Sequence, residues 1–204
     1  MGAADRAELP LFPLQTVLFP GGLLSLKVFE ARYLDLMADC LRERSAFGVV
    51  ALKRGSEVRQ GGGKVEFEAT GVRAELIDVD SAQPGILQVR CKGLARFSIE
   101  NRVQQGDGLW RARTRELPED ETLAPTEALV GTVNGLANAI GALKAQGTEP
   151  FLAPYRFDDA GWVANRWCEI LPIPLAAKQK LMELPDPIAR LQLVDEYLRG
   201  KGVV

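Results

Sequence analysis

The spacing of apolar residues changes once along this chain of 204 residues, and that change most narrows the folds open to it. Up to about residue 116, apolar and polar positions tend to alternate, most clearly in the run from 86 to 92. Alternation of this kind places the apolar side chains on one face of a strand. After about residue 126, apolar residues recur every three or four positions, as they do on one face of a helix. We therefore predict a β half followed by a helical half.

The β half consists of short apolar runs that are separated by turn residues. Strand candidates fall at 11–14, 24–28, 47–52, 65–69, 72–79, 86–92, 95–103 and 109–116. Pro84-Gly85 and Gly93 are turn signals between the later ones. One helix is expected at 29–44, because apolar residues recur there at helical spacing: Phe29, Tyr33, Leu34, Met37, Cys40 and Leu41. So many short strands with so few helices favour an antiparallel, barrel-like sheet.

Four helices are predicted in the second half. Apolar stripes define helices that begin near Leu129, after Asp158 or Asp159, and at about 175. A last helix should begin at Asp186, a capping residue followed by proline in the first helical position. The predicted organisation is a β subdomain at 9–116, a linker at 117–125 and a helical bundle at 126–200.

The sequence contains no histidine, and this excludes many kinds of active site. Ser-His-Asp and Cys-His catalysis and HExxH zinc sites all need an imidazole. No GxxxxGK[ST] phosphate loop occurs, and the 61–64 segment (GGGK) lies between a polar loop and a strand, so we interpret it as a hairpin. Ser25 and Lys27 share a strand face, which is typical of a solvated surface. We expect no catalytic residue, no cofactor and no metal.

The cysteines indicate a reducing compartment. Cys40, Cys91 and Cys168 are far apart and odd in number, which argues against a disulfide framework. The first eight residues lack the basic segment of a signal peptide. The uncharged stretch at 9–26 is interrupted by prolines and glycines that would break a membrane helix. We expect a cytoplasmic protein that does not enter a membrane.

The region from 86 to 116 is locally basic, although the whole chain carries a net charge of −2. Its candidate basic face comprises Arg90, Arg96, Arg111, Arg113 and Arg115. A basic strand face is compatible with RNA binding. However, Phe97 and Trp110 are the only aromatic residues in the run, and both fall on the presumed core face, where they could not stack on bases. We therefore keep RNA binding as the alternative, and favour a solvated face or a site for an acidic partner.

Several short motifs occur along the chain in a fixed order. They are 9–14 (LPLFPL), 17–21 (VLFPG), 26–34 (LKVFEARYL), 71–74 (GVRA), 93–97 (GLARF), 171–174 (LPIP) and the closing stretch 178–191. In this order they resemble the N-terminal, substrate-binding domain family of Lon-type ATP-dependent proteases, over roughly residues 9 to 198. The resemblance implies a PUA-like, six-stranded antiparallel β-barrel with one helix, followed by a helical bundle.

The same resemblance implies a non-enzymatic polypeptide-recognition module. Its expected partners are unfolded or apolar polypeptide segments, together with a protease or chaperone. No segment resembles the ATPase or protease domains of that family, so we expect a stand-alone member. The apolar opening has two interpretations: it seals the barrel, or part of it lines a groove for apolar peptides. On the second interpretation, the candidate contacts are Phe12, Leu14, Leu18 and Phe19.

Overall fold

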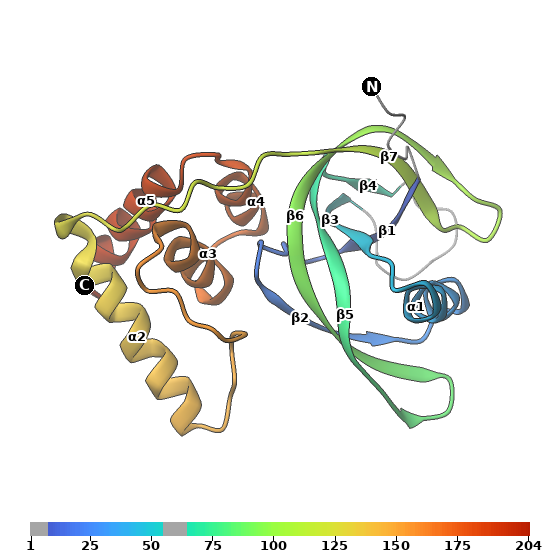
Figure 1. Cartoon of the computed structure of the whole chain (residues 1–204), viewed down its shortest axis with the longest axis horizontal. Helices are drawn as coiled ribbons and strands as arrows, with labels where there is room; N and C mark the ends of the chain where they lie inside the picture. The colour runs from blue at the N-terminus through green and yellow to red at the C-terminus, as the bar shows by residue number, and fades with distance from the viewer. Residues whose placement is uncertain (1–7, 55–64) are drawn as a thin grey trace. The chain divides into compact units, whose positions relative to one another are not determined.

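The computed structural model describes residues 8–54 and 65–204, and the chain divides into two compact units, 1–118 and 119–204 (Figure 1). Each unit is described by itself. The predicted hairpin at 61–64 lies outside the described residues. Within the described part of the chain, no helix has the length and apolar character needed to cross a membrane.

The first unit is a mainly antiparallel sheet with one helix. Its elements are β1 (Leu9–Leu14), β2 (Leu23–Val28), α1 (Ala31–Glu43), β3 (Phe47–Arg54), β4 (Glu66–Phe67), β5 (Thr70–Gln83), β6 (Ile86–Gln104) and β7 (Trp110–Glu116). The strands pair in the order β1-β7-β6-β5-β3, and β1 also pairs with β3 in parallel, so these five pairings form a closed circuit. Outside the circuit, β4 pairs with β3 and β2 pairs with β6. The antiparallel sheet is confirmed, but the described strands number seven, not six.

β6 passes through Gly93 without a break, so the predicted turn between two strands is wrong. The Gly93 N–H donates to the Gly22 carbonyl, and the Gly93 carbonyl accepts from the Gly21 N–H. A Cβ at position 93 would overlap the carbonyl oxygen of Phe19. This glycine therefore permits a close approach between β6 and the chain that leads into β2, rather than a change of direction.

Two other glycines make room for one core side chain. Phe97 is fully buried in a cluster with Leu9, Leu11, Val50, Leu52, Phe67 and Ala112. A Cβ at Gly48 or at Gly71 would lie 2.7 Å from Cζ of the Phe97 ring. The motifs at 71–74 and 93–97 thus meet in space, because the phenylalanine of one occupies volume that the glycine of the other leaves open.

α1 buries part of the predicted apolar stripe. Tyr33, Met37 and Cys40 are buried as predicted, and Leu36, which the prediction did not include, is buried with them. Phe29 and Leu41 are each 51% exposed, and the helix begins only at Ala31. Phe29 therefore belongs to the connection between β2 and α1, and its apolar ring stands at the surface of the unit.

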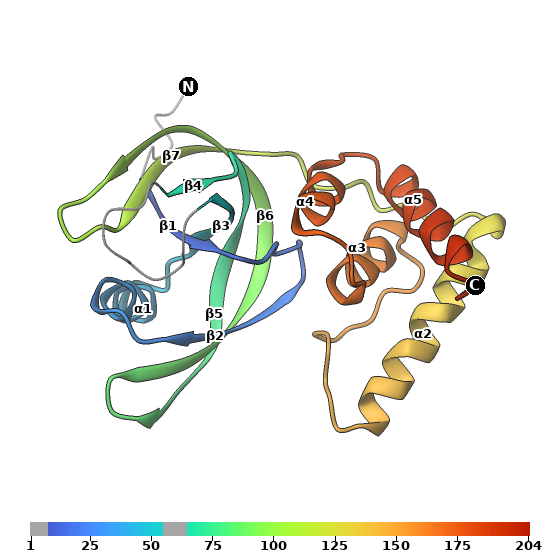
Figure 2. The same ribbon diagram turned by 180° about the vertical axis from the view of Figure 1, so that it is seen from behind.

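The second unit is helical, as predicted. Its elements are η1 (Glu127–Leu129), α2 (Val130–Ala145), α3 (Ala160–Ile170), α4 (Leu175–Glu183) and α5 (Pro187–Gly200), which Figure 2 shows from behind. The Asp159 carboxylate accepts from the Gly161 and Trp162 N–H groups at the start of α3, so Asp159 rather than Asp158 is the cap. The Asp186 carboxylate accepts from two N–H groups at the start of α5, which confirms the predicted cap. The core of the unit comes from all four α-helices and includes Leu136, Val163, Met182, Leu191 and Leu198.

Candidate functional site

A cavity of about 290 Å³ lies between β1, β2 and the start of α1. Its lining residues are Phe12, Leu14, Ser25, Leu26, Lys27, Val28, Phe29, Glu30 and Tyr33. Aromatic and aliphatic side chains predominate, with a few polar groups among them. This composition is typical of a site that binds apolar groups and orients them by a small number of polar contacts.

Stacked aromatic rings form one wall of the cavity. The ring of Phe12 lies 3.8 Å from the ring of Tyr33, centroid to centroid, at an angle of 6°. The Arg32 guanidinium lies 4.6 Å from the Tyr33 ring centroid. It also forms an ion pair with Glu30 at 3.0 Å and donates to the Gly108 carbonyl at 2.8 Å. These contacts fix the start of α1, so this wall is organised before any ligand arrives.

The strand β2 forms another part of the cavity wall. Successive side chains of a strand point to opposite faces, yet four consecutive residues of β2 line the cavity. The edge of β2, and not one face alone, therefore borders the cavity. Among the described strands, β6 is the only partner of β2, so the second edge of β2 pairs with no strand of the described part of the chain.

The four predicted polypeptide contacts separate into two pairs. Phe12 and Leu14 line the cavity, although only 6% and 3% of their surfaces are exposed. Leu18 and Phe19 are 5% and 0% exposed and do not line it. The sequence analysis missed Phe29, the most exposed apolar residue of the lining, because it assigned Phe29 to the buried stripe of a helix. Its position directly after an apolar strand was the signal for a surface connection.

The five predicted basic residues do not form one face. Arg96 is 5% exposed and donates to the Pro118 carbonyl. Arg90 stands opposite Ser25 of β2 and Asp78 of β5, in the first half of β6. Arg111, Arg113 and Arg115 belong to β7, which pairs with the second half of β6.

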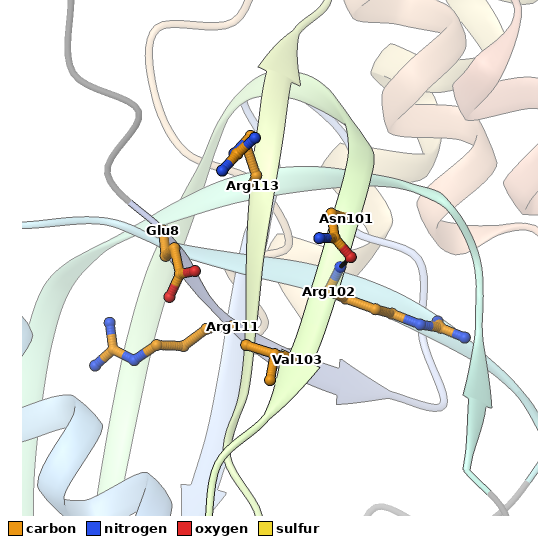
Figure 3. A pocket seen from close by; sticks show the side chains of 6 residues that line it. All are labelled: Glu8, Asn101, Arg102, Val103, Arg111 and Arg113. Carbon is orange, nitrogen blue, oxygen red and sulfur yellow. Dashed lines mark hydrogen bonds between the residues drawn. The ribbon is translucent and has the colours of Figure 1, made fainter.

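A second, smaller cavity of about 70 Å³ lies among the arginines of β6 and β7 and is lined by Glu8, Asn101, Arg102, Val103, Arg111 and Arg113 (Figure 3). In Figure 3 the side chains of Arg102 and Arg111 extend in opposite directions. The Arg102 guanidinium lies 4.3 Å from the Phe67 ring centroid and 5.5 Å from that of Trp110. The guanidinium groups of Arg102 and Arg111 therefore do not together cradle a phosphate at this cavity.

The buried thiols are poor nucleophiles. Cys40, Cys91 and Cys168 are all free and buried. Burial raises the pKa of Cys91 and of Cys168 to about 12, and it also raises the pKa of Cys40. A thiol with so high a pKa is almost entirely protonated at neutral pH, and the thiolate is the reactive form.

The carboxylate of Glu169 has a raised pKa. Burial raises the pKa of Glu169 to about 7, while the charges of Arg166 and Lys178 lower it. Arg166 forms an ion pair with Glu169 at 2.9 Å, and the Lys178 Nζ donates to the Glu169 backbone carbonyl at 3.0 Å. Glu169 lines neither of the two cavities, so we assign it to a structural ion pair. No group of three or more metal-ligating side chains occurs among the described residues.

Known proteins resemble this chain over nearly its whole length. Lon protease of Anaeromyxobacter dehalogenans is 29% identical over 203 residues, which are 96% of this chain and 23% of that protein. Lon protease 2 of Myxococcus xanthus is 29% identical over 201 residues, which are 95% of this chain and 24% of that protein. The chain thus spans about a quarter of the length of these relatives.

Solved structures and a family model agree with this. The Lon N-terminal domain protein from Xanthomonas campestris superposes with a TM-score of 0.74 at 28% identity, covering 94% of this chain and 98% of that one. The N-terminal domain of the Mycobacterium avium complex Lon protease has the same fold, with a TM-score of 0.63 at 16% identity over 94% of this chain and 97% of that one. The family model of the ATP-dependent protease La (LON) substrate-binding domain matches residues 8–200. The chain therefore belongs to the family of LON substrate-binding domains.

Proposed function

We propose that this chain binds unfolded or apolar polypeptide segments at the cavity between β1, β2 and α1. The observation that carries the proposal is an apolar cavity of about 290 Å³ with a half-exposed aromatic residue, Phe29, in its lining. An exposed phenylalanine beside an apolar cavity is costly to keep in water, and a bound apolar side chain would cover both. Family membership supports the same proposal.

The proposed activity is recognition without catalysis. The chain has no histidine, and its thiols are buried with raised pKa values. Its match to the Lon proteases covers about a quarter of their length and falls within the substrate-binding family. A protease or chaperone partner would then act on the polypeptide that this chain binds. The unpaired thiols support a reducing compartment, the cytoplasm, as the place of action.

Affinity at a single site of this kind should be weak. Full burial of one large apolar side chain contributes roughly 1.5–3 kcal/mol, and ordering a flexible polypeptide offsets much of that gain. Repeated sites in an assembly would raise the overall affinity through effective concentration. We therefore expect dissociation constants in the range of tens to hundreds of micromolar, on the order of −5 to −6 kcal/mol.

The test is a titration of a fluorescently labelled, permanently unfolded polypeptide, followed by anisotropy. The Phe29→Ser variant should bind roughly five- to ten-fold more weakly, because it removes apolar surface that the ligand would cover. Leu41→Ser is the matched control, since Leu41 is also 51% exposed and does not line the cavity. Equal losses in both variants, or no binding by the parent chain at several hundred micromolar, would contradict the proposal.

A further inference from the structure

We propose that the second edge of β2 takes up an extended polypeptide segment as an additional strand, and that the preferred segment alternates apolar with acidic side chains. This inference rests on the proposed function, because it states which polypeptides the cavity accepts and in which conformation. It concerns the backbone of β2 and the charge at Lys27, neither of which is needed for simple apolar contact with Phe29.

The hydrogen bonds show which groups of β2 point outward. The Gly93 N–H donates to the Gly22 carbonyl, so the Gly22 carbonyl points toward β6 at the start of the ladder. The register then continues without a shift from Leu23 opposite Lys92 to Val28 opposite Leu87. In an antiparallel ladder, hydrogen-bonded and non-hydrogen-bonded pairs alternate. The outward N–H and C=O groups are therefore those of Leu23, Ser25 and Lys27.

These outward groups form a template for another strand. Among the described strands none pairs with this edge, and the edge borders the cavity. Main-chain pairing along an exposed edge gives affinity without regard to sequence, while pockets beside the edge select alternate side chains. A helical ligand could fill the apolar cavity, but its backbone groups are already paired and could not bond to this edge.

The side chains of β2 divide between an apolar and a polar face. Leu26 and Val28 alternate with the exposed Ser25 and Lys27. Leu26 stands opposite Val89, which is 1% exposed, so its side of β2 faces the interior. A strand added to this edge would continue both faces. Every second side chain of the ligand would thus enter the apolar cavity, and the side chains between would lie beside Ser25 and Lys27.

Charge identifies the second feature of the ligand. Lys27 is exposed, its neighbour across the ladder is the neutral Gln88, and no carboxylate of the described residues forms an ion pair with it. An acidic side chain on the added strand would stand directly beside this ammonium group, a favourable cross-strand pair. Pairing of β2 with β2 of a second copy would instead place the Lys27 ammonium groups of both copies on the joined edge, with no carboxylate of β2 to pair with them. The edge therefore favours an acidic ligand strand over self-association.

The backbone part of the proposal is tested with Ser25→Pro. Proline removes only the Ser25 N–H, which points away from β6, so the ladder with β6 stays intact. The control Ser25→Ala removes the hydroxyl and keeps the N–H. The probe is an eight-residue peptide of alternating Val and Asp, and its affinity should fall about five-fold in Ser25→Pro and not in Ser25→Ala. Far-UV circular dichroism would check that both variants keep the parent fold.

The charge part is tested by exchange of charge. At low salt, Lys27→Glu should lower the affinity for the Val–Asp peptide about three-fold and raise the affinity for a Val–Lys peptide by a similar factor. Both changes in affinity should become smaller as the salt concentration rises. An unchanged preference between the two peptides would overturn the charge assignment. Analytical ultracentrifugation compares the parent chain with Ser25→Pro. A dimer that forms in the parent chain and is absent in Ser25→Pro would show that a second copy binds this edge, and it would overturn the proposal.

The outcomes separate this inference from the proposed function. If the parent chain and Ser25→Pro bind unfolded polypeptide equally while Phe29→Ser does not, the cavity binds polypeptides without strand addition, and only this inference fails. If no polypeptide binds to the parent chain, the proposed function fails and this inference fails with it.

Discussion

Arg190 in α5 and Asp120, seventy residues earlier, form an ion pair with 2.5 Å between Nη1 and Oδ2. The arginine is 1% exposed and also donates to the Asn165 side chain and to the Leu181 and Leu184 carbonyls. One buried guanidinium thus joins α3, the end of α4, α5 and the segment predicted as a linker. That segment is therefore a fixed part of the second unit from Asp120 onward.

Removal of the Asp120 carboxylate should destabilise the second unit. Asp120→Asn leaves the buried Arg190 charge without its counter-ion, and breaking one partner of such a pair costs about 3 kcal/mol. The exposed Glu121 provides the control, since Glu121→Gln changes the same formal charge one residue away. Urea denaturation followed by tryptophan fluorescence would measure both, because Trp162 and Trp167 belong to α3. Equal stability of the two variants would show that the ion pair contributes nothing.

Two glycines of the first unit, Gly71 and Gly93, should not tolerate a methyl group. A Cβ at Gly71 would overlap the Val49 carbonyl oxygen, and one at Gly93 would overlap that of Phe19. Both obstacles are backbone atoms, so Gly71→Ala and Gly93→Ala should each cost about 2–4 kcal/mol or prevent folding. Gly106→Ala is the control, because nothing lies within 4 Å of its Cβ position. Thermal unfolding of the three variants would rank them, and a stable Gly93→Ala protein would argue against the close approach of the chain at this point.

Glu169 should make the stability of the second unit depend on pH. Burial raises its pKa from 4.5 to about 7 in the folded chain, so between these values the folded chain binds the proton more tightly than the unfolded chain. Its contribution to the free energy of unfolding is therefore present below about pH 4.5 and is lost as the pH rises to about 7. Glu169→Gln should flatten this part of the profile, whereas Glu196→Gln, at an exposed position, should leave it unchanged. Urea titrations at pH 5 and pH 7.5 measure the difference.

The thiols should be inert until the chain unfolds. With all three buried and the pKa of Cys91 and of Cys168 at about 12, a disulfide reagent at pH 7.5 should modify the native protein only at the rate of its opening. In 8 M urea, roughly three equivalents should react at once, one for each free thiol. Rapid labelling of one thiol in the native state would instead point to a reactive cysteine and reopen the question of catalysis.

Local patterns were sufficient to predict most of the elements. Asp186 followed by Pro187 defines the start of α5, and alternation identifies the strands, because both signals depend only on neighbours in sequence. The continuity of β6 could not be predicted in this way. The role of Gly93 depends on the Phe19 carbonyl, which is more than seventy residues away in sequence. Turn prediction considers only the residues next to a glycine, so it could not detect this contact.

The candidate site was only partly predictable for the same reason. The apolar opening indicated an apolar surface or core, but whether Phe12 or Phe19 reaches a cavity depends on where α1 and β6 pack. The basic residues give the clearest case. Their spacing suggested one face, but Arg96 is buried. Arg90 lies in the part of β6 that pairs with β2, whereas Arg111 lies on β7, which pairs with the other part of β6. A strand that changes partners along its length separates residues that the sequence groups together.

That long strand has a further consequence for how the chain can be rearranged. β6 pairs with β5 from Ile86 to Ser98, while β2 and β7 share its other edge. New chain ends opened by circular permutation inside Leu87–Lys92 would disrupt the pairing of β6 with both β5 and β2. Ends opened at the exposed turn of Pro84 and Gly85 would detach none. The barrel should therefore accept a relocated terminus, or an inserted tag, at that hairpin and reject it a few residues later.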